Sequence, residues 1–293
     1  MILRLPTRTI SFPRRPLLMG IVNINSDSFS GDGTLDIEEA LDHAERLVAS
    51  GADLIDVGGE SARTNRVAIP AEEEIARIAP FINRWKGRVA ESRVGPRDEL
   101  QVWPPILSIN TWRPPVAEAA LAAGGELLND MSGLPDQLNA RVAAKYGAAL
   151  LIMHSVGEPK VAHTHVHYRD VMQELRDFFS DKMEQAESSG LDSAQIVLDP
   201  GIDFAKQRED NLRIFRELAT LTEFGCPILM PVSRKTVIGE VLGIERPVDR
   251  DAGTMAAVIA GLEAGAAIFR VHHVEAAYQT VKLWEAVHKG FGD

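Results

Sequence analysis

The chain has 293 residues, of which 45% are hydrophobic and 25% charged, values typical of a soluble globular protein with a sizeable core. Its formal net charge of −11 argues against a nucleic-acid binder or a membrane-surface protein, so any affinity for anions must come from a local cluster of cations. The sequence shows no signal peptide, no apolar run long enough to span a bilayer, and a single cysteine, Cys226, which cannot form an internal disulfide. We therefore expect a cytoplasmic protein with Cys226 as a small buried hydrophobe.

Short apolar runs alternate with longer helical patterns along the chain, which favours βα units and a parallel sheet. Taken in order, the expected strands are 17–24, 54–57, 106–109, 127–129, 149–153, 196–198, 228–232 and 267–271. The expected helices are 37–50, 71–84, 115–123, 136–146, 168–189, 209–223, 253–264 and 275–289, and most are followed by glycine, as is common where helices end.

Eight strands in strict alternation with eight helices predict an α/β fold, a (β/α)8 TIM barrel. We expect a single domain over residues 1–293, with a barrel core at about 17–289 and an insertion at about 86–105 on the face opposite the site. An open, doubly wound sheet is the structural alternative, but the chain has no Gly-x-Gly-x-x-Gly fingerprint.

Nearly every expected strand ends in a polar group, and the strand ends of such a barrel are where its chemistry gathers. Each group has a structural explanation of its own: Asp199 before Pro200 suits a turn, and His154 suits a satisfied strand-end histidine. Such separate explanations do not account for polar groups at the ends of nearly all the strands, which would place them together at one end of the barrel. The groups are Asn23, Asn25, Asp56, Glu60, Ser108, Asn110, Thr111, Asn129, Asp130, His154, Asp199, Ser233, Arg234, Lys235, Arg270, His272 and His273.

The strand-end groups favour a heterocycle and an anion as ligands. The run 232–239, Val-Ser-Arg-Lys-Thr-Val-Ile-Gly, places two cations and two hydroxyls where a strand gives way to a helix, which favours anion binding. Carboxylate and amide groups suit the edge of a flat heterocycle, while Lys, Arg and His suit a phosphate-type anion. The mixture predicts displacement at a carbon whose leaving group is a bound phosphate or pyrophosphate.

Metal-ligand patterns are weak in this sequence. A caged catalytic zinc is not expected, because no His-Glu-x-x-His or paired-Cys motif occurs. The spacing of His163, His165 and His167 could chelate a metal, but we interpret this segment as a polar loop, since it lies beside Gly157 and Pro159.

Six runs of the chain closely resemble dihydropteroate synthase, and they recur in that family's order across about residues 17–285. They are Met19-Gly20-Ile21-Val22-Asn23 with Asp27-Ser28-Phe29-Ser30, Ile55-Asp56-Val57-Gly58-Gly59-Glu60-Ser61, Asn129-Asp130-Met131-Ser132-Gly133, Asp199-Pro200-Gly201-Ile202, Ser233-Arg234-Lys235 and Arg270-Val271-His272. The resemblance implies a barrel that forms a homodimer and joins 6-hydroxymethyl-7,8-dihydropterin pyrophosphate to p-aminobenzoate, giving dihydropteroate and pyrophosphate, with Mg2+. Departure of pyrophosphate would leave a cationic methylene group that the aniline nitrogen attacks, while loops 24–34 and 61–69 close over it.

The same resemblance assigns roles to single residues. Asp199 would pair with the amino-pyrimidine edge of the pterin, and Asn129 with its ring nitrogens. Lys235 would contact the pterin oxygen and N5. Asn23, Lys235, Arg270 and His272 form the expected catalytic set, in which Arg270 stacks on the ring and joins His272 and Asn23 in holding pyrophosphate; Asn23 would also help to place Mg2+. The remaining substrate-binding residues are Met153 and Phe204 as apolar cover, Ser233 and Thr236 for the aminobenzoate carboxylate, and Asn110 and Arg63.

The departures from the family pattern are concentrated at one strand end and in two loops. Asn110 stands where the family has an aspartate, which removes a negative charge near the pterin. The first loop lacks the usual Thr-Pro, and in the second loop Ala62 and Thr64 flank Arg63 where Ser-Thr-Arg-Pro-Gly is expected. The pterin half of the site is therefore retained and the amine half is altered. The alternatives are a paralogue that uses another arylamine, of methanopterin type, a non-catalytic pterin-binding protein, and a pterin-dependent methyltransferase.

Overall fold

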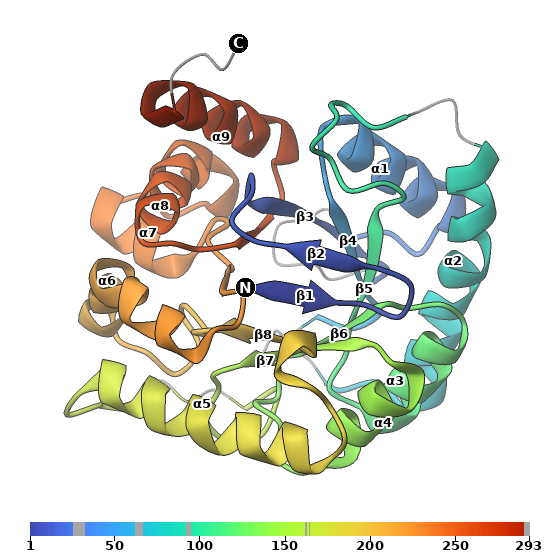
Figure 1. Ribbon diagram of the computed structural model, residues 1–293, viewed down its shortest axis with the longest axis horizontal. Coiled ribbons are helices and arrows are strands. Elements are labelled where there is room, and N and C mark those ends of the chain that lie inside the picture. Colours follow the sequence, from blue (N-terminus) through green and yellow to red (C-terminus); the bar gives the residue numbers. More distant parts are fainter. Residues whose placement is uncertain (26–32, 62–66, 92–94, 162, 164, 290–293) are drawn as a thin grey trace.

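Eight parallel strands form a barrel in the computed structural model, which describes all residues except 26–32, 62–66, 92–94, 162, 164 and 290–293 (Figure 1). The sheet runs in the order β8-β7-β6-β5-β4-β3-β10-β9. A parallel bridge between Leu198 and Ile228 joins the two ends of this order and closes the barrel. The strands are β3 (Leu17–Asn23), β4 (Leu54–Gly58), β5 (Ile106–Asn110), β6 (Leu127–Asp130), β7 (Ala149–Met153), β8 (Ile196–Asp199), β9 (Leu229–Met230) and β10 (Ile268–Val271). The predicted fold is confirmed.

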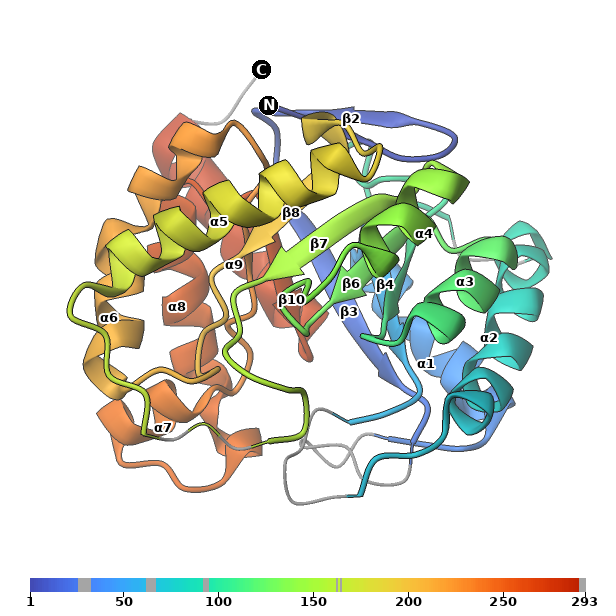
Figure 2. The ribbon, with the colours of Figure 1, turned by 90° about the horizontal axis from the view of Figure 1, so that it is seen from below.

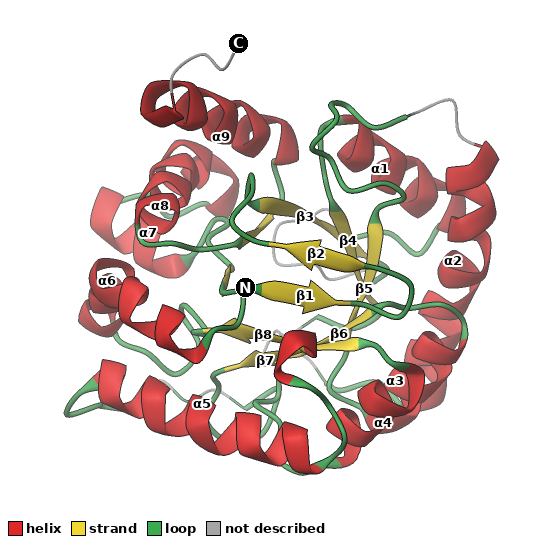
Figure 3. Cartoon of the chain, viewed as in Figure 1, coloured by secondary structure: helices red, strands yellow, loops and turns green. Residues whose placement is uncertain are grey.

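Helices surround the strands (Figure 3). They are α1 (Ile37–Ala49), α2 (Ala71–Glu91), α3 (Pro114–Ala122), α4 (Leu138–Tyr146), α5 (Val171–Ser188), α6 (Arg208–Glu217), α7 (Thr236–Leu242), α8 (Asp251–Glu263) and α9 (Val274–Lys289), with 3-10 turns at Ser193–Gln195, Leu218–Phe224 and Pro247–Arg250. Several boundaries differ from the sequence prediction, and α7 adds a helix between the predicted helices 209–223 and 253–264. The helix α2 continues to Glu91, into the segment interpreted as an insertion, and the predicted helix 209–223 ends at Glu217 and continues as a 3-10 turn. No helix in the described part of the chain is long and apolar enough to cross a membrane.

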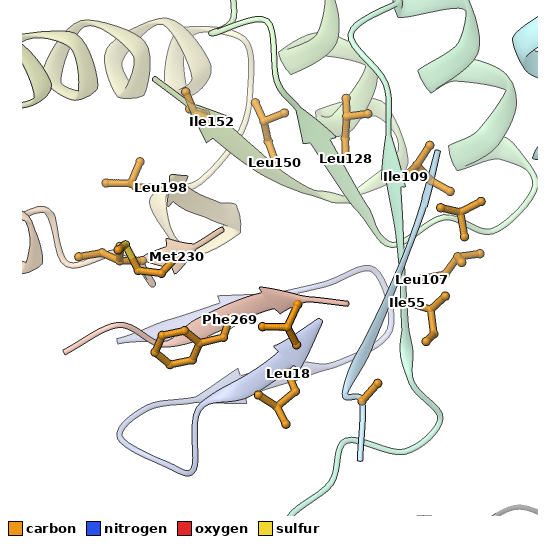
Figure 4. Packing of buried hydrophobic residues seen from close by; sticks show 14 of the residues in the cluster. Leu18, Ile55, Leu107, Ile109, Leu128, Leu150, Ile152, Leu198, Met230 and Phe269 are labelled. Carbon is orange, nitrogen blue, oxygen red and sulfur yellow. The ribbon is translucent and has the colours of Figure 1, made fainter. Parts of the chain in front are cut away.

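Side chains on the strands alternate between two apolar layers, because successive residues of a strand point to opposite faces. One set packs outward against the helices and includes Leu18, Ile55, Leu128, Leu150 and Phe269 (Figure 4). The other set fills the barrel interior and includes Leu17, Leu54, Ile106, Leu127, Ala149, Leu151, Val197, Leu229 and Ile268. Cys226 belongs to the outer cluster, where its side chain is buried. Burial raises the pKa of its thiol to about 12, so the thiol stays protonated and packs as a small hydrophobic side chain.

A short hairpin that the sequence prediction omitted covers one end of the barrel. Its strands, β1 (Ile2–Arg4) and β2 (Thr9–Ser11), pair antiparallel, and Leu3 and Ile10 join the interior apolar cluster. Figure 2 shows the hairpin at one end of the barrel and α7 at the other.

Part of the segment 86–105 packs at the end of the barrel where the strands begin. The Gln101 amide donates to the carbonyls of Val48 and Ala52, and the Val102 N–H donates to Asp53 over 2.8 Å. Asp53 also pairs with Arg15 at 3.0 Å, and both side chains are fully buried. The mouth, at the opposite end where the strands end, is therefore surrounded by the βα connections.

Candidate active site

The polar groups of the mouth occupy the next inward-facing position along the strands, after the apolar residues that fill the barrel. Leu54 and Asp56 are two residues apart on β4, as are Leu127 and Asn129 on β6. The same spacing recurs on β5, β8 and β10. Period-two alternation therefore brings groups from several strands to one surface. They are Asp56, Ser108, Asn110, Asn129, Met153, Asp199 and Arg270. Asp130 has the opposite parity and bonds instead to Ser132 and to Asn139 of α4.

Asp56 is the centre of a hydrogen-bond network that joins four strands. Its fully buried carboxylate accepts from the Ser108 hydroxyl at 2.6 Å, the Asn129 amide at 3.0 and 3.2 Å, and the Asn110 amide at 3.3 Å. The Arg270 Nε donates to the same carboxylate over 2.7 Å, and the Arg270 side chain is 23% exposed. The network holds Asn129 and Arg270 in fixed positions at the mouth.

This network corrects the reading of Asn110 as a lost charge alone. The Asn110 amide donates to the Asp56 carboxylate over 3.3 Å, so the negative charge at this point is carried by Asp56. An aspartate at position 110 would place a second carboxylate at the same distance, and like charges so close raise the pKa of one of them. Asn110 therefore completes the donors around Asp56.

Asp199 ends β8 as an almost fully buried carboxylate. It accepts from the Gly201 N–H over 2.7 Å, and burial raises its pKa to about 6, against the opposing effects of that hydrogen bond and of Lys235. Gly201 has φ +67°, and a Cβ atom there would lie 2.1 Å from the carbonyl oxygen of His154, so only glycine fits this turn. The turn aims an acceptor-only group at the mouth.

Lys206 lies beneath the same turn, and sequence reasoning missed it. Its Nζ lies 2.8 Å from His154 Nδ1 and donates to the Phe204 carbonyl over 3.1 Å. Burial lowers the pKa of Lys206 to about 7, although Asp199 acts to raise it, and burial with the nearby lysine charge lowers the pKa of His154 to about 2. His154 is therefore neutral and accepts from Lys206 through Nδ1. A second titratable cation thus stands near Asp199.

The run Ser233-Arg234-Lys235 divides between structure and site. Lys235 Nζ donates to the Ile202 carbonyl over 2.7 Å and lies 4.8 Å from the centroid of the Phe204 ring, and burial lowers the pKa of Lys235. Ser233 Oγ lies 2.7 Å from His272 Nδ1, which fixes the orientation of that histidine. Arg234 instead makes two hydrogen bonds to Asp251, at 2.7 and 3.0 Å, so it does not serve as an open cation of an anion site.

The start of α7 is already occupied by a side chain of this protein. Asp203 Oδ2 accepts from the N–H of Thr236, and Asp203 Oδ1 accepts from the N–H of Val237 over 3.2 Å. Thr236 is exposed and lines a cavity of about 450 Å³. Other residues lining this cavity are Trp112, Glu158, Lys160, Phe204, Lys206 and Glu240. Among the predicted site residues that the structure describes, Phe204 and Thr236 line it and the others do not.

Ion pairs at the rim connect three βα loops. Glu60, after β4, accepts from Lys160, after β7, at 3.1 Å and from Arg113, after β5. Arg113 also pairs with the buried Glu74 of α2, and Lys160 donates to the Ser61 carbonyl over 2.9 Å. The rim of the mouth is held by charges that sit outside the predicted site.

The chain matches the family model described as a pterin binding enzyme over residues 19–272. A dihydropteroate synthase of Synechocystis is 38% identical over 278 residues, covering 94% of this chain and 91% of the relative. The Xanthomonas albilineans dihydropteroate synthase solved with 4-aminobenzoic acid superposes with a TM-score of 0.83 at 36% identity, covering 98% of both chains. That of Yersinia pestis, in a sulfonamide drug complex, gives a TM-score of 0.86 at 31% identity, covering 99% of both chains.

The chain belongs to the dihydropteroate synthase family. It is thus an enzyme and a transferase, and the resemblance carried by the six runs is confirmed. Among the family's motif residues in this chain, Asn129 and Arg270 meet at Asp56, and Asp199 interacts electrostatically with Lys235 and Arg270.

Other predicted residues of this dihydropteroate synthase family member are placed less completely. Met153 belongs to the interior apolar cluster, and Phe204 packs against it. Asn23 ends β3, where its carbonyl accepts from the Thr34 N–H over 3.0 Å. Arg63, with Ala62 and Thr64, lies outside the described residues, as do large parts of the two loops expected to close.

Three residues outside the predicted site make contacts central to its geometry. Asp56 carried a signal, since it stands two residues after an inward apolar position on its strand. Lys206 and Asp203 carried none, because they follow a strand at distances that no periodicity fixes.

Proposed function

We propose that this chain condenses 6-hydroxymethyl-7,8-dihydropterin pyrophosphate with p-aminobenzoate to give dihydropteroate and pyrophosphate. The observation that carries the proposal is Asp199: a buried carboxylate at a strand end, with Asn129, Lys235 and Arg270 around the same mouth. A carboxylate that only accepts hydrogen bonds matches the amino-pyrimidine edge of a pterin, which only donates at two adjacent nitrogens.

The pterin ring would lie between the interior cluster and Arg270. Asn129 is held by Asp56 with its amide oxygen left for the ring, and Lys235 stands over Phe204 within reach of the pterin oxygen. Met153 and Phe204 supply apolar contact to one face, and Arg270, held through Nε by Asp56, keeps its terminal nitrogens for stacking or for pyrophosphate.

The pyrophosphate group would be held by Arg270, His272 and Asn23. In the described part of the chain, no group of three or more His, Cys, Asp and Glu could hold a metal, whereas the Asn23 side chain offers an amide oxygen at the end of β3. These residues fit a Mg2+ ion that arrives with pyrophosphate and takes one protein ligand, a common arrangement for this ion. Bound there, Mg2+ would neutralise charge on the leaving pyrophosphate.

The reaction breaks the bond between the pterin methylene carbon and the pyrophosphate oxygen and forms a bond from that carbon to the amine nitrogen. The electron pair of the broken bond leaves with pyrophosphate, and the amine nitrogen loses one proton. Arg270, His272 and Asn23, which would hold pyrophosphate, would stabilise the negative charge that develops on the leaving group.

Pyrophosphate release by the purified chain, with both substrates and Mg2+, tests the proposal. Turnover that depends on p-aminobenzoate supports it, and tight pterin binding without release contradicts it. The Asp199→Asn variant should lose pterin affinity by at least about a hundredfold, because two charge-assisted hydrogen bonds are removed. Unchanged affinity would remove Asp199 from the pterin site.

A homodimer and a cytoplasmic location complete the proposal. Exposed aliphatic side chains on or beside the last three helices, Val241, Val248, Ile259 and Leu283, offer apolar surface for a second copy of the chain. Sedimentation of the pure protein tests the assembly: a dimer supports it, and a monomer at micromolar concentration contradicts it.

A further inference from the structure

Lys206 and His154 form a buried pair beneath the turn that carries Asp199. Lys206 Nζ lies 2.8 Å from His154 Nδ1 and donates to the Phe204 carbonyl over 3.1 Å. The side chain of His154 is fully buried, and its ring meets the ring of Phe178 edge-on, with the two ring centroids 4.7 Å apart. Because two acceptors fix the ammonium group of Lys206, it occupies one defined position under the turn.

Gly201 brings this lysine close to the carboxylate of Asp199. The N–H of Gly201 donates to Asp199 Oδ1 over 2.7 Å, and a Cβ atom on Gly201 would lie 3.3 Å from Lys206 Nζ. One glycine therefore contacts both charged groups. Because Asp199 and Lys206 are 3% and 9% exposed, water screens the attraction between them little, and each charge shifts the pKa of the other.

Lys206 differs from the two other cations that act on Asp199, which are Lys235 and Arg270. Both of those residues have a proposed contact with the substrate, and Arg270 is also paired with Asp56 at 2.7 Å. Lys206 has no proposed contact with the substrate, and the acceptors printed for its Nζ both belong to the protein. Its charge is therefore available to Asp199 whether or not the pterin is bound.

The charge of Lys206 is present in the pH range where Asp199 titrates. Burial raises the pKa of Asp199 to about 6 and lowers that of Lys206 to about 7, so Lys206 is still a cation when Asp199 takes up its proton. A cation nearby favours the ionised form of a carboxyl group. The other charged or titratable groups that face this pair are His154, Glu174, Asp203, Asp210, Lys235 and Arg270.

We propose that Lys206 is a positioning residue of the pterin site, whose ammonium group, fixed by His154 under the turn, keeps the Asp199 carboxylate ionised for the pterin. This inference rests on the proposed function, because Asp199 is the residue proposed to accept from the pterin. Lys206 acts through Asp199 and does not touch the substrate. Loss of its charge should therefore weaken pterin binding where Asp199 titrates and leave binding at high pH unchanged.

The pH dependence of 6-hydroxymethyl-7,8-dihydropterin affinity tests this role in the wild type and Lys206→Met. Calorimetry between pH 5 and pH 8.5 should place the wild-type midpoint near pH 6 and raise it by about one pH unit in Lys206→Met. At pH 6 the variant should then bind about fivefold more weakly than the wild type, and at pH 8.5 the two affinities should agree within about twofold. Lys206→Gln, which keeps a donor for His154 but no charge, should show the same rise.

A matched lysine and a measurement without ligand separate the outcomes. Lys160 lines the same cavity and its side chain is 10% exposed, but it pairs with Glu60, so Lys160→Met should leave the midpoint unchanged. Carboxyl-carbon NMR of aspartate-labelled protein measures the pKa of Asp199 directly, with its signal identified by loss in Asp199→Asn, and this pKa should rise in Lys206→Met.

The two measurements also distinguish this inference from the proposed function. Wild-type protein that binds no pterin contradicts the proposed function, and the NMR comparison still decides the role of Lys206. An Asp199 pKa that is equal in the wild type and Lys206→Met overturns that role. A loss of pterin affinity of the same size at every pH overturns it as well, because a purely structural effect does not follow the titration of Asp199.

Discussion

Replacing Asp56 by asparagine should destabilise the protein, because every side-chain contact of its carboxylate is with a donor. Oδ1 accepts from Ser108 and Asn129, and Oδ2 accepts from Asn129, Asn110 and Arg270. In either orientation of the new amide, its NH2 group would face donors. The ion pair with Arg270 is lost as well.

The expected loss of stability follows from these contacts. A charge-assisted hydrogen bond contributes about 1.5–3 kcal/mol, and a buried donor left without an acceptor costs about 1–3 kcal/mol. Because the Arg270 side chain is 23% exposed, water recovers part of its share. We therefore expect the free energy of unfolding of Asp56→Asn to fall by about 3 kcal/mol, which for a chain of this size lowers Tm by about 6 °C. Because Arg270 also loses the bond that positions it, the KM for the pterin pyrophosphate should rise.

Thermal unfolding followed by circular dichroism measures the change, with Asp42→Asn as the matched control. Asp42 pairs with Arg88 at the surface, where its side chain is 51% exposed, so its replacement should cost less than about 1 kcal/mol. A Tm for Asp56→Asn within about 1 °C of the wild type would refute the reasoning, since it would mean that the five donated bonds contribute nothing net.

Three further outcomes follow from the charges at the mouth. Asp199 must be ionised to accept from a pterin, so with its pKa raised by burial to about 6, pterin affinity measured by calorimetry should fall about tenfold at pH 5. Burial lowers the pKa of Lys206 to about 7, so protonating it in the folded protein destabilises the wild type as pH falls from about 10.5 towards 7; Lys206→Met should therefore gain about 3.5 kcal/mol over the wild type between pH 10 and pH 7 in urea unfolding. Glu60→Gln breaks the bridge to Lys160 and Arg113 and should cost about 2 kcal/mol in the same assay.

Each of these outcomes has a control that isolates its cause. The pH dependence of pterin binding should vanish in Asp199→Asn, and a wild-type affinity that is flat between pH 5 and 7.5 would contradict the raised pKa. Lys145→Met removes an exposed lysine and should show no gain at pH 7; a Lys206→Met gain that does not change with pH would be packing alone. Glu73→Gln breaks a surface pair with Arg77 and should cost about 0.5 kcal/mol or less.

The strands and their inward ends could be predicted because each strand repeats the same local pattern. An apolar inward residue followed two positions later by a polar one, as in Leu127 and Asn129, both marks the strand and places the site. The hairpin of β1 and β2 lacks such a signal, because each strand has three residues and shows one inward side chain, Leu3 or Ile10. The hairpin is recognised from its packing against the end of the barrel.

The partners of long polar side chains were beyond sequence reasoning for a different reason. Arg234 and Lys235 are neighbours in the sequence and both suggest anion binding, but one turns to Asp251 and the other to the site. Which cation is paired depends on a carboxylate 17 residues away, brought near by the packing of α8. Sequence composition at a strand end therefore predicts what kinds of groups meet, and the tertiary contacts decide which charge is left for a ligand.

The tertiary contacts also change which departures from the family pattern matter in this enzyme. By sequence, the altered amine half of the site rests on two loops, around residues 24–34 and 61–69. In the structure, Asp203, in the connection after β8, accepts from the first two N–H groups of α7, a contact that could not be foreseen from the sequence. Asn110, which reads as a departure on the pterin side, instead completes the donors of Asp56. The charge balance around Asp56 is thus kept with an amide at position 110, because Arg270 and three neutral donor side chains surround the carboxylate.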